Sequence, residues 1–330
     1  MQRRHLLSAS GATAIAAVLA GSASPARAQT WPARPIRLVV PFPAGGPTDS
    51  FARLYAAALA QQLGQSVVVE NRAGASGAIG TLEVKRSAAD GYTLLFGTAS
   101  THALYNLIQP KPQYDALEDF AYVAVLGGSP VVFAVGPTLP RTLKAVVIAA
   151  KFNPGKYNYG SPGSGTLLHV AAERLKSVTG APIAHVPYKG SAPALQDLIG
   201  GNIEMTVDTL GSLLPHHQSG RARILAVAAP KRLALAPDIP TVAESADLDK
   251  PFDAMLWNVV VAPRNTPPAV LQRLTEATQR AMGDAALRNR LESQSMFVDL
   301  HAGPVAAVAF VIRERDKWKP IIATLGDLSS

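Results

Sequence analysis

Short runs of β-branched residues alternate with stretches that are apolar at helical spacing along the first third of the chain. The run at 36–41 precedes a turn rich in glycine and proline, and an apolar helical stripe then begins at Phe51 and ends before Gly64. Similar runs at 66–70 and 92–96 each lead into another turn of small residues. Successive strand–turn–helix units predict a parallel sheet whose loops gather at the carboxyl ends of its strands.

The second half of the chain repeats this plan. A strand-like run enters the turn at 160–165, Leu168 and Leu175 lie on one face of the helix that follows, and Gly180 ends that helix. The repetition predicts two similar α/β lobes rather than one long sheet. Further strands and helices in the same alternation are expected at 183–187, 194–199, 205–208 and 223–228.

Two apolar stretches are expected to carry the chain between the lobes. In the first, runs at 122–126 and 131–135 flank the sequence Gly-Gly-Ser-Pro at 127–130. This arrangement predicts two strands separated by a hinge-like break. The second crossing is the apolar run at 252–262.

These crossings set the expected lobe boundaries. Lobe 1 would comprise residues 29–127 and about 253–330, and lobe 2 would comprise residues 128–252. The last helix mixes apolar and charged residues, which is typical of an amphipathic helix with a solvated face, and it is expected to span or contact both lobes. The helices that close the chain are predicted at 269–282, 285–294 and 305–325.

The first 28 residues have the composition of an export signal. Arg3 and Arg4 precede a mildly apolar segment at 6–19, which is too short to span a bilayer, and Ala-Arg-Ala at 26–28 fits a cleavage site. The mature chain would begin at Gln29 and lie in a bacterial periplasm. The paired arginines also loosely resemble a twin-arginine signal. We favour the general secretory route and keep the twin-arginine route as the alternative.

Composition narrows the class of protein. The 330 residues are 48% apolar with a formal charge of +8, and removing the predicted signal leaves 28 basic against 23 acidic residues, or +5. This modest excess favours anionic small molecules, and the basic residues form no stripe interleaved with aromatic residues, as nucleic-acid binding would need. The sequence has no cysteine, which excludes disulfides and thiolate chemistry.

The turn that opens the helix near residue 166 carries candidate binding chemistry. Gly163 and Gly165 would let a ligand approach the backbone closely, and Ser161, Ser164 and Thr166 add hydroxyl groups. The first N–H groups of a helix lack intrahelical partners and lie at the positive end of its dipole, so this turn suits an anion. The alternative is an ordinary capped helix start, but the recurrence of such turns favours a binding site.

The sequence lacks the patterns that catalysis needs. Pro162 stands where a G-x-S-x-G motif around Ser164 would need glycine, and the adjacent His216 and His217 cannot both face one metal ion. Neither nucleotide motif, G-x-G-x-x-G after the first strand or G-x-x-x-x-G-K-[ST], is present. His169 would either donate to a bound anion or play a structural role. We expect a binding protein with no catalytic residue, metal or cofactor.

Several motifs carry a family resemblance. In the first lobe they are the loop at 41–49, Val-Glu-Asn-Arg at 69–72 and Asp-Gly-Tyr-Thr-Leu-Leu at 90–95. In the second lobe they are the stretch at 158–169 and His-Val-Pro-Tyr-Lys-Gly at 185–190. Together with Pro-Thr-Val-Ala-Glu-Ser near residue 240, they resemble the Bug family, the periplasmic solute-binding proteins of tripartite tricarboxylate transporters. The ordered matches cover the mature chain nearly end to end.

The resemblance implies an α/β, two-lobed type II periplasmic-binding fold of the Venus flytrap kind, with parallel-sheet lobes joined by two crossover segments. It implies a small carboxylate-containing ligand held between the lobes, membrane subunits of a tripartite transporter as partners, and a monomeric chain. Carried over position by position, the ligand-binding residues would be Phe42, Ala44, Gly45, Gly46, Thr48, Asp49, Ala75, Ser76, Ser100, Thr101, Ser161, Gly163, Ser164, Gly165, Thr166, His169, Lys189 and Asp208.

Some of these residues have structural alternatives. Thr48 or Asp49 would cap the helix that follows the first strand. For Asp49 there are two alternatives, a plain helix cap or a cap that also shapes a ligand-binding loop. Lys189 would be a solvated turn lysine or would help to attract acids. Trp257 is expected in the core or hinge rather than stacked under a ligand.

Two other functions are consistent with the sequence. The protein would present its ligand to a membrane signalling receptor instead of a permease, or, more remotely, it would be an exported hydrolase that depends on Ser164. Neighbouring genes or capture of the membrane partner would separate the first from transport, and loss of product formation in Ser164→Ala would reveal the second.

Overall fold

The computed structural model describes residues 31–328, so the predicted export signal and Gln29 lie outside the described residues. Residues from Arg34 onward form one compact unit. Residues 31–33, which belong to the preceding unit, form no helix or strand. Within the described range, no helix is both long and apolar enough to cross a membrane.

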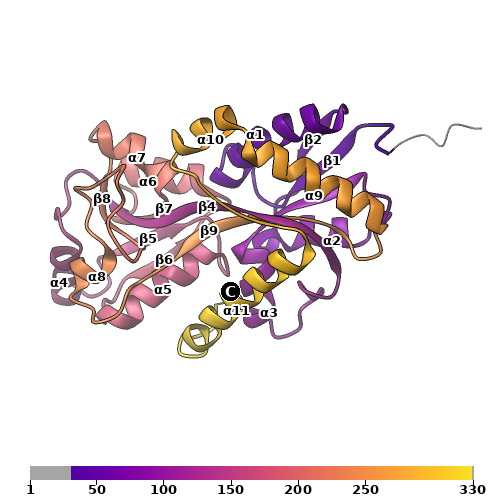
Figure 1. The fold of residues 1–330 in the computed structure, drawn as a ribbon. Coiled ribbons are helices and arrows are strands. Elements are labelled where there is room, and N and C mark those ends of the chain that lie inside the picture. Colours follow the sequence, from indigo (N-terminus) through magenta and orange to yellow (C-terminus); the bar gives the residue numbers. More distant parts are fainter. Residues whose placement is uncertain (1–30, 329–330) are drawn as a thin grey trace, which may run out of the picture. The chain divides into compact units, whose positions relative to one another are not determined.

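A mixed sheet organises the unit that begins at Arg34, with its main strands in the order β2-β1-β3-β9-β4-β7-β5-β6 (Figure 1). β1 is parallel to β2 and β3, and β5 is parallel to β6 and β7, whereas β9 and β4 pair antiparallel with their neighbours. β8 and β10 also pair antiparallel with β4. The strands are β1 (Ile36–Val40), β2 (Val67–Asn71), β3 (Thr93–Thr98), β4 (Phe120–Val135), β5 (Asn158–Ser161), β6 (Ala184–Pro187), β7 (Met205–Thr209), β8 (Arg223–Val227), β9 (Met255–Pro263) and β10 (Phe297–Ala302).

Helices connect these strands in the alternation that the sequence predicts. We call the group around β1–β3 the first lobe and the group around β5–β8 the second lobe. The α-helices are α1 (Pro47–Leu63), α2 (Ala78–Lys85), α3 (Tyr105–Ile108), α4 (Leu143–Phe152), α5 (Leu167–Thr179), α6 (Ser191–Gly200), α7 (Leu210–Gln218), α8 (Val242–Ala246), α9 (Pro268–Gly283), α10 (Ala285–Glu292) and α11 (Pro304–Ile322), with short non-α turns at η1 (Ala75–Gly77) and η2 (Ser100–Leu104).

Strand β4 is continuous over 16 residues, so the predicted break at 127–130 is wrong. Gly127 adopts φ +99°, and the pairing register with β9 shifts between Val125 and Gly127. The extra backbone is therefore absorbed as a bulge instead of ending the strand. A side chain on Gly128 would lie 1.9 Å from the carbonyl oxygen of Leu256, which explains why glycine stands where β4 passes β9.

Strand β4 joins the two lobes. It pairs with β9 from Phe120 to Pro130, with β7 from Val131 to Val135 and with β8 from Val132 to Val135, so it crosses between the lobes near Pro130. Figure 1 shows β4 running alongside β9. The lobes are thus mixed rather than purely parallel, because both crossover strands run antiparallel to their neighbours. The boundaries at 127/128 and 252/253 stay a prediction.

The core follows the two-residue period of the crossover strand. Val131, Phe133 and Val135 face one large cluster of buried apolar side chains, whereas Val132 and Ala134 face a second cluster in the second lobe. The first cluster includes buried residues of both lobes, so a single apolar core runs through the crossover.

The carboxyl-terminal helix α11 is amphipathic, as predicted. Ala307, Val311 and Trp318 are its buried residues, and the helix packs against β4 and the η2 turn. Trp257 is buried and donates its indole N–H to Glu314 over 3.1 Å, which confirms core packing for this tryptophan. Elements that the sequence did not predict are β10, α7 and α8.

Candidate functional site

A cavity of about 130 Å³ lies where strand-to-helix turns of the two lobes meet. The turn between β1 and α1 forms its first-lobe wall, and the turns that open α5 and α6 form its second-lobe wall. A larger hollow of about 540 Å³, bordered also by the turn after β2, shares six lining residues with the cavity. The two spaces therefore adjoin, with Lys189 on the wall of both.

The predicted site residues divide into three groups. Seven line the cavity, namely Phe42, Ala44, Gly46, Thr48, Ser100, Thr166 and Lys189. Ala75, Ser76, Gly163 and Ser164 line the adjoining hollow. The others border neither space, and these are Gly45, Asp49, Thr101, Ser161, Gly165, His169 and Asp208. The roles of all of them in ligand binding stay predictions.

The first-lobe turn is held by Asp49 from behind. Helix α1 begins at Pro47 with Gly46 as its N-cap and without a side-chain cap, so the predicted capping by Thr48 or Asp49 is wrong. Proline is suited to the first helical position because it has no N–H to satisfy. Asp49 instead accepts from the N–H of Gly45 over 2.9 Å.

Two further side chains complete this brace. Arg53 Nε donates to Asp49 Oδ2 over 2.9 Å, and Asn71 Nδ2 donates to Asp49 Oδ1 over 2.9 Å and to the Phe42 carbonyl over 3.0 Å. Burial alone would raise the pKa of Asp49, but the hydrogen bonds from Arg53, Gly45 and Asn71 together hold that pKa below its usual value. Asp49 is therefore an ionised carboxylate, and Arg53 balances its charge within the first lobe.

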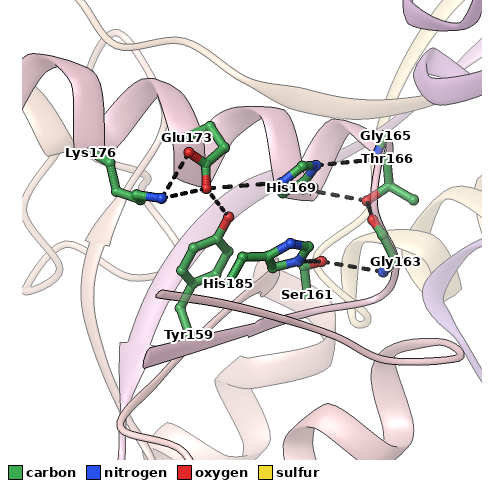
Figure 2. A network of polar contacts seen from close by, with 9 residues as sticks. All are labelled: Tyr159, Ser161, Gly163, Gly165, Thr166, His169, Glu173, Lys176 and His185. Atoms are coloured by element: carbon green, nitrogen blue, oxygen red, sulfur yellow. Dashed lines mark hydrogen bonds and ion pairs between the residues drawn. The ribbon is translucent and has the colours of Figure 1, made fainter. Parts of the chain in front are cut away.

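The second-lobe turn is held from behind by an imidazole. Thr166 is the N-cap of α5, accepting from the N–H of His169 over 3.3 Å and donating to the Gly163 carbonyl over 2.7 Å (Figure 2). The N–H of Gly165 donates to His169 Nδ1 over 3.0 Å. Since Nδ1 is an acceptor here, the neutral ring carries its proton on Nε2. His169 thus holds the turn from behind, and its contact with a ligand stays a prediction.

A second histidine supports this arrangement. The His185 ring stacks on the His169 ring with centroids 4.0 Å apart, and His185 Nε2 forms a 2.7 Å hydrogen bond with Ser161 Oγ (Figure 2). The Ser161 hydroxyl oxygen also accepts from the N–H of Gly163 over 3.2 Å. Burial lowers the pKa of His169, and burial together with the neighbouring His169 lowers the pKa of His185 to about 4. Both rings are therefore neutral at neutral pH.

Glu173 anchors the far side of this network. It accepts hydrogen bonds from the Tyr159 hydroxyl and from Lys176 Nζ, the latter over 2.8 Å, and it lies 3.9 Å from His169 Nε2 (Figure 2). Burial would raise the pKa of Glu173, but the bonds from Lys176 and Tyr159 lower it. Lys176 thus balances the charge of Glu173, and Glu173 does not line the cavity.

Asp208 lies behind the remaining wall. Its carboxyl group is buried, and Oδ1 accepts from the N–H of Thr209 over 2.6 Å. Burial nevertheless raises the pKa of Asp208. Ser191 lines the cavity, and Asp208 does not.

The two lobes touch at the same turns. The Leu167 N–H donates to Ser100 Oγ over 3.0 Å, and the Ser76 hydroxyl donates to the Ser164 carbonyl. A side chain on Gly190 would lie 3.0 Å from Cγ of Pro43, so glycine permits the close approach of these turns. The two hydrogen bonds and the close packing of Gly190 on Pro43 would both have to be broken if the lobes moved apart.

This geometry suits an anion. The starts of α1, α5 and α6 line the cavity, and each presents the positive end of a helix dipole. Among the described residues, no carboxylate lines the cavity, and no cluster of histidine and acidic residues could hold a metal ion. Sequence reasoning missed Leu168, Ser191 and Leu256, although Ser191 directly follows a glycine at a helix start, as Pro47 does.

Comparisons with known proteins agree with this architecture. Residues 51–327 match the family described as "Tripartite tricarboxylate transporter family receptor". The chain is 37% identical to the protein BugT of Bordetella pertussis over 310 residues, which cover 93% of this chain and 94% of BugT. Its structure resembles MatC of Rhodopseudomonas palustris, solved with bound malate, at TM-score 0.83 and 31% identity, covering 88% of this chain and all of MatC.

A second R. palustris structure extends the comparison. This protein was solved with adipate and matches at TM-score 0.84 and 35% identity, covering 89% of this chain and 98% of that protein. The matches to these binding-protein structures establish the two-lobed α/β fold that the sequence predicts.

Proposed function

Because this chain belongs to the family of tripartite tricarboxylate transporter receptors, we propose that it binds a small carboxylate-containing molecule between its two lobes and delivers it to the membrane subunits of such a transporter. The family consists of transport receptors, so the chain is a solute-binding protein and not an enzyme. The solved relatives that carry malate and adipate support a carboxylate as the ligand.

One observation of this chain carries the proposal. Three helix starts from two lobes, together with Lys189, border one cavity that has no carboxylate on its wall among the described residues. Backbone N–H groups at helix starts stabilise a bound anion without adding a formal charge. The predicted residues that line the cavity or the adjoining hollow would contact the ligand or its water shell, and the others would hold the turns in place.

The proposal includes a location and a mode of action. The structure of a periplasmic transporter, 37% identical to this chain, matches at TM-score 0.84, which supports a periplasmic site of action. The proposed export removes residues 1–28. Lobes 1 and 2, divided near residues 127 and 252, would separate about β4 and β9 to admit the ligand and close around it.

A thermal-shift screen tests the proposal. The purified protein, without residues 1–28, is heated with mono-, di- and tricarboxylates, aromatic acids and acidic amino acids. A ligand that binds the folded state raises the Tm by mass action. At least one carboxylate should raise the Tm and bind with a submillimolar Kd by calorimetry, without turnover. A complete absence of binding among carboxylates, with amides or sugars binding instead, would refute it.

A further inference from the structure

We propose that the preferred ligand is a compact monocarboxylate with an apolar body, and that a second carboxylate on the ligand weakens binding. This inference rests on the proposed function, because it specifies which acids the same cavity accepts. The observations that carry it are Lys189, the single charged side chain at the cavity among the described residues, and the apolar lining of the cavity.

The side chains at the cavity supply one positive charge. Among the described residues, Lys189 is the one charged side chain that lines either the cavity or the adjoining hollow. The nearby cations are committed elsewhere. Arg53 is paired with Asp49 at 2.9 Å, and Lys176 is paired with Glu173 at 2.8 Å. A second carboxylate would therefore lose its hydration without gaining a cation.

One hydroxyl group on the wall is already committed within its own turn. Thr166 donates its hydroxyl proton to the Gly163 carbonyl over 2.7 Å. A bound carboxylate accepts hydrogen bonds and donates none, so the Thr166 hydroxyl cannot satisfy it.

The rest of the lining is apolar. Four prolines line the cavity together with Phe42, Leu168 and Leu256. The side chains of all seven residues are apolar. The volume of about 130 Å³ is close to the roughly 150 Å³ of an apolar protein cavity that holds one benzene ring. A single aromatic ring or a short aliphatic chain would fill this space and bury its surface against the wall.

Matched pairs of acids test the inference by calorimetry. Hexanoate and adipate differ only in a terminal carboxylate, and benzoate and phthalate differ only in a second ring carboxylate. We expect hexanoate to bind at least about tenfold more tightly than adipate, and benzoate more tightly than phthalate. Adipate or phthalate binding as tightly as its partner would overturn the inference while leaving the proposed function intact.

A charge-insertion variant sharpens the test. Ala192 is exposed, lines the cavity and is the second residue of α6, so Ala192→Lys adds a cation at the site. Ala269 is exposed and is the second residue of α9 away from the cavity, which makes Ala269→Lys a matched control with the same change in net charge and helix dipole.

Ala192→Lys should narrow the gap between hexanoate and adipate by about fivefold or more, whereas Ala269→Lys should leave it unchanged. An unchanged gap in both variants would show that charge shortage does not set the preference, and would overturn the inference. If no carboxylate of the thermal-shift screen binds the wild-type protein at all, the proposed function itself is wrong.

Discussion

The two turns that face the cavity share a backbone device and differ in its chemistry. At residues 41–46 and 162–166, a glycine N–H is held by the side chain four residues later, Gly45 by Asp49 and Gly165 by His169. In the first lobe the acceptor is an ionised carboxylate, and in the second lobe it is a neutral imidazole. Because charge-assisted hydrogen bonds are roughly twice as strong as neutral ones, the first turn should be the more rigid.

The two turns can thus be held in place from behind without adding a charge to the cavity. Asp49 and Glu173 each lie behind their turn with a cation of their own, so neither repels an anion in the cavity. The turns themselves present glycine, proline and small hydroxyl residues to the ligand. Under the proposed function, selectivity would depend on Lys189 and on the apolar wall.

The largest effect is expected from breaking the charged brace. Asp49→Asn keeps the shape of the side chain but replaces one carboxylate oxygen with an NH₂ group. Arg53 and Asn71 both donate to Asp49, so this NH₂ group would face a donor in either orientation. The free energy of unfolding should fall by about 2–3 kcal/mol, as for a lost charge-assisted bond, in urea denaturation followed by circular dichroism.

The matched control is Asp316→Asn at an exposed ion pair with Arg315, which should change stability by less than about 0.5 kcal/mol. A cost of Asp49→Asn no larger than that of the control would contradict the account of the first turn.

The neutral brace should cost less to break. His169→Phe keeps a ring that stacks on His185 but removes the acceptor for the Gly165 N–H. We expect a loss of about 1–2 kcal/mol, the usual cost of one buried unpaired donor. If this variant were destabilised more than Asp49→Asn in the same urea experiment, the ranking of the two turns would be reversed.

Local signals explain why these turns could be located from the sequence. A β-branched run followed by glycine and a helical stripe defines β1–α1 and β5–α5, and both lie where the sequence predicts them. The helix start at Pro47 was misplaced, although a glycine followed by proline is itself a signal for the N-cap and first helical position.

Contacts between distant residues explain what the sequence could not supply. Asn71 reaches Asp49 from the next strand, and His185 reaches His169 from the strand parallel to β5, so neither brace is visible in a local pattern. The continuity of β4 was missed because glycine reads as a break, whereas here it allows close packing against β9.

Ligand affinity should depend on Lys189, the one charged side chain at the cavity within residues 31–328. Lys189→Gln removes the charge at an exposed position, so we expect about tenfold weaker carboxylate binding, or roughly 1.4 kcal/mol, with little change in the Tm of the ligand-free protein. Calorimetry with the best monocarboxylate checks this. An unchanged Kd would assign Lys189 to the solvated turn and leave binding to the helix starts alone.

Acid should loosen the second turn before the first. His169 and His185 have pKa values below the ordinary 6.5, so the unfolded chain binds more protons than the folded chain as pH falls from about 6.5 to about 4. Their stabilising contribution is present above pH 6.5 and is lost across that window. The lowered pKa of Asp49 preserves its contribution until the pH falls below about 3.8.

Amide hydrogen exchange at pH 5 and pH 7, corrected for intrinsic rates, checks this difference. Protection at residues 162–166 should fall by about 1 kcal/mol at pH 5, after allowance for solvent screening of the half-buried His185, and protection at 41–46 should not change. Equal loss at both turns would show that the two braces do not differ in the way described.

A crystal structure with benzoate or hexanoate would locate the bound carboxylate. We expect one carboxylate in the cavity, within hydrogen-bonding distance of backbone N–H groups at the start of α1 in the first lobe and at the start of α5 or α6 in the second lobe. A carboxylate bound outside this cavity, or held by residues of one lobe alone, would contradict this expectation.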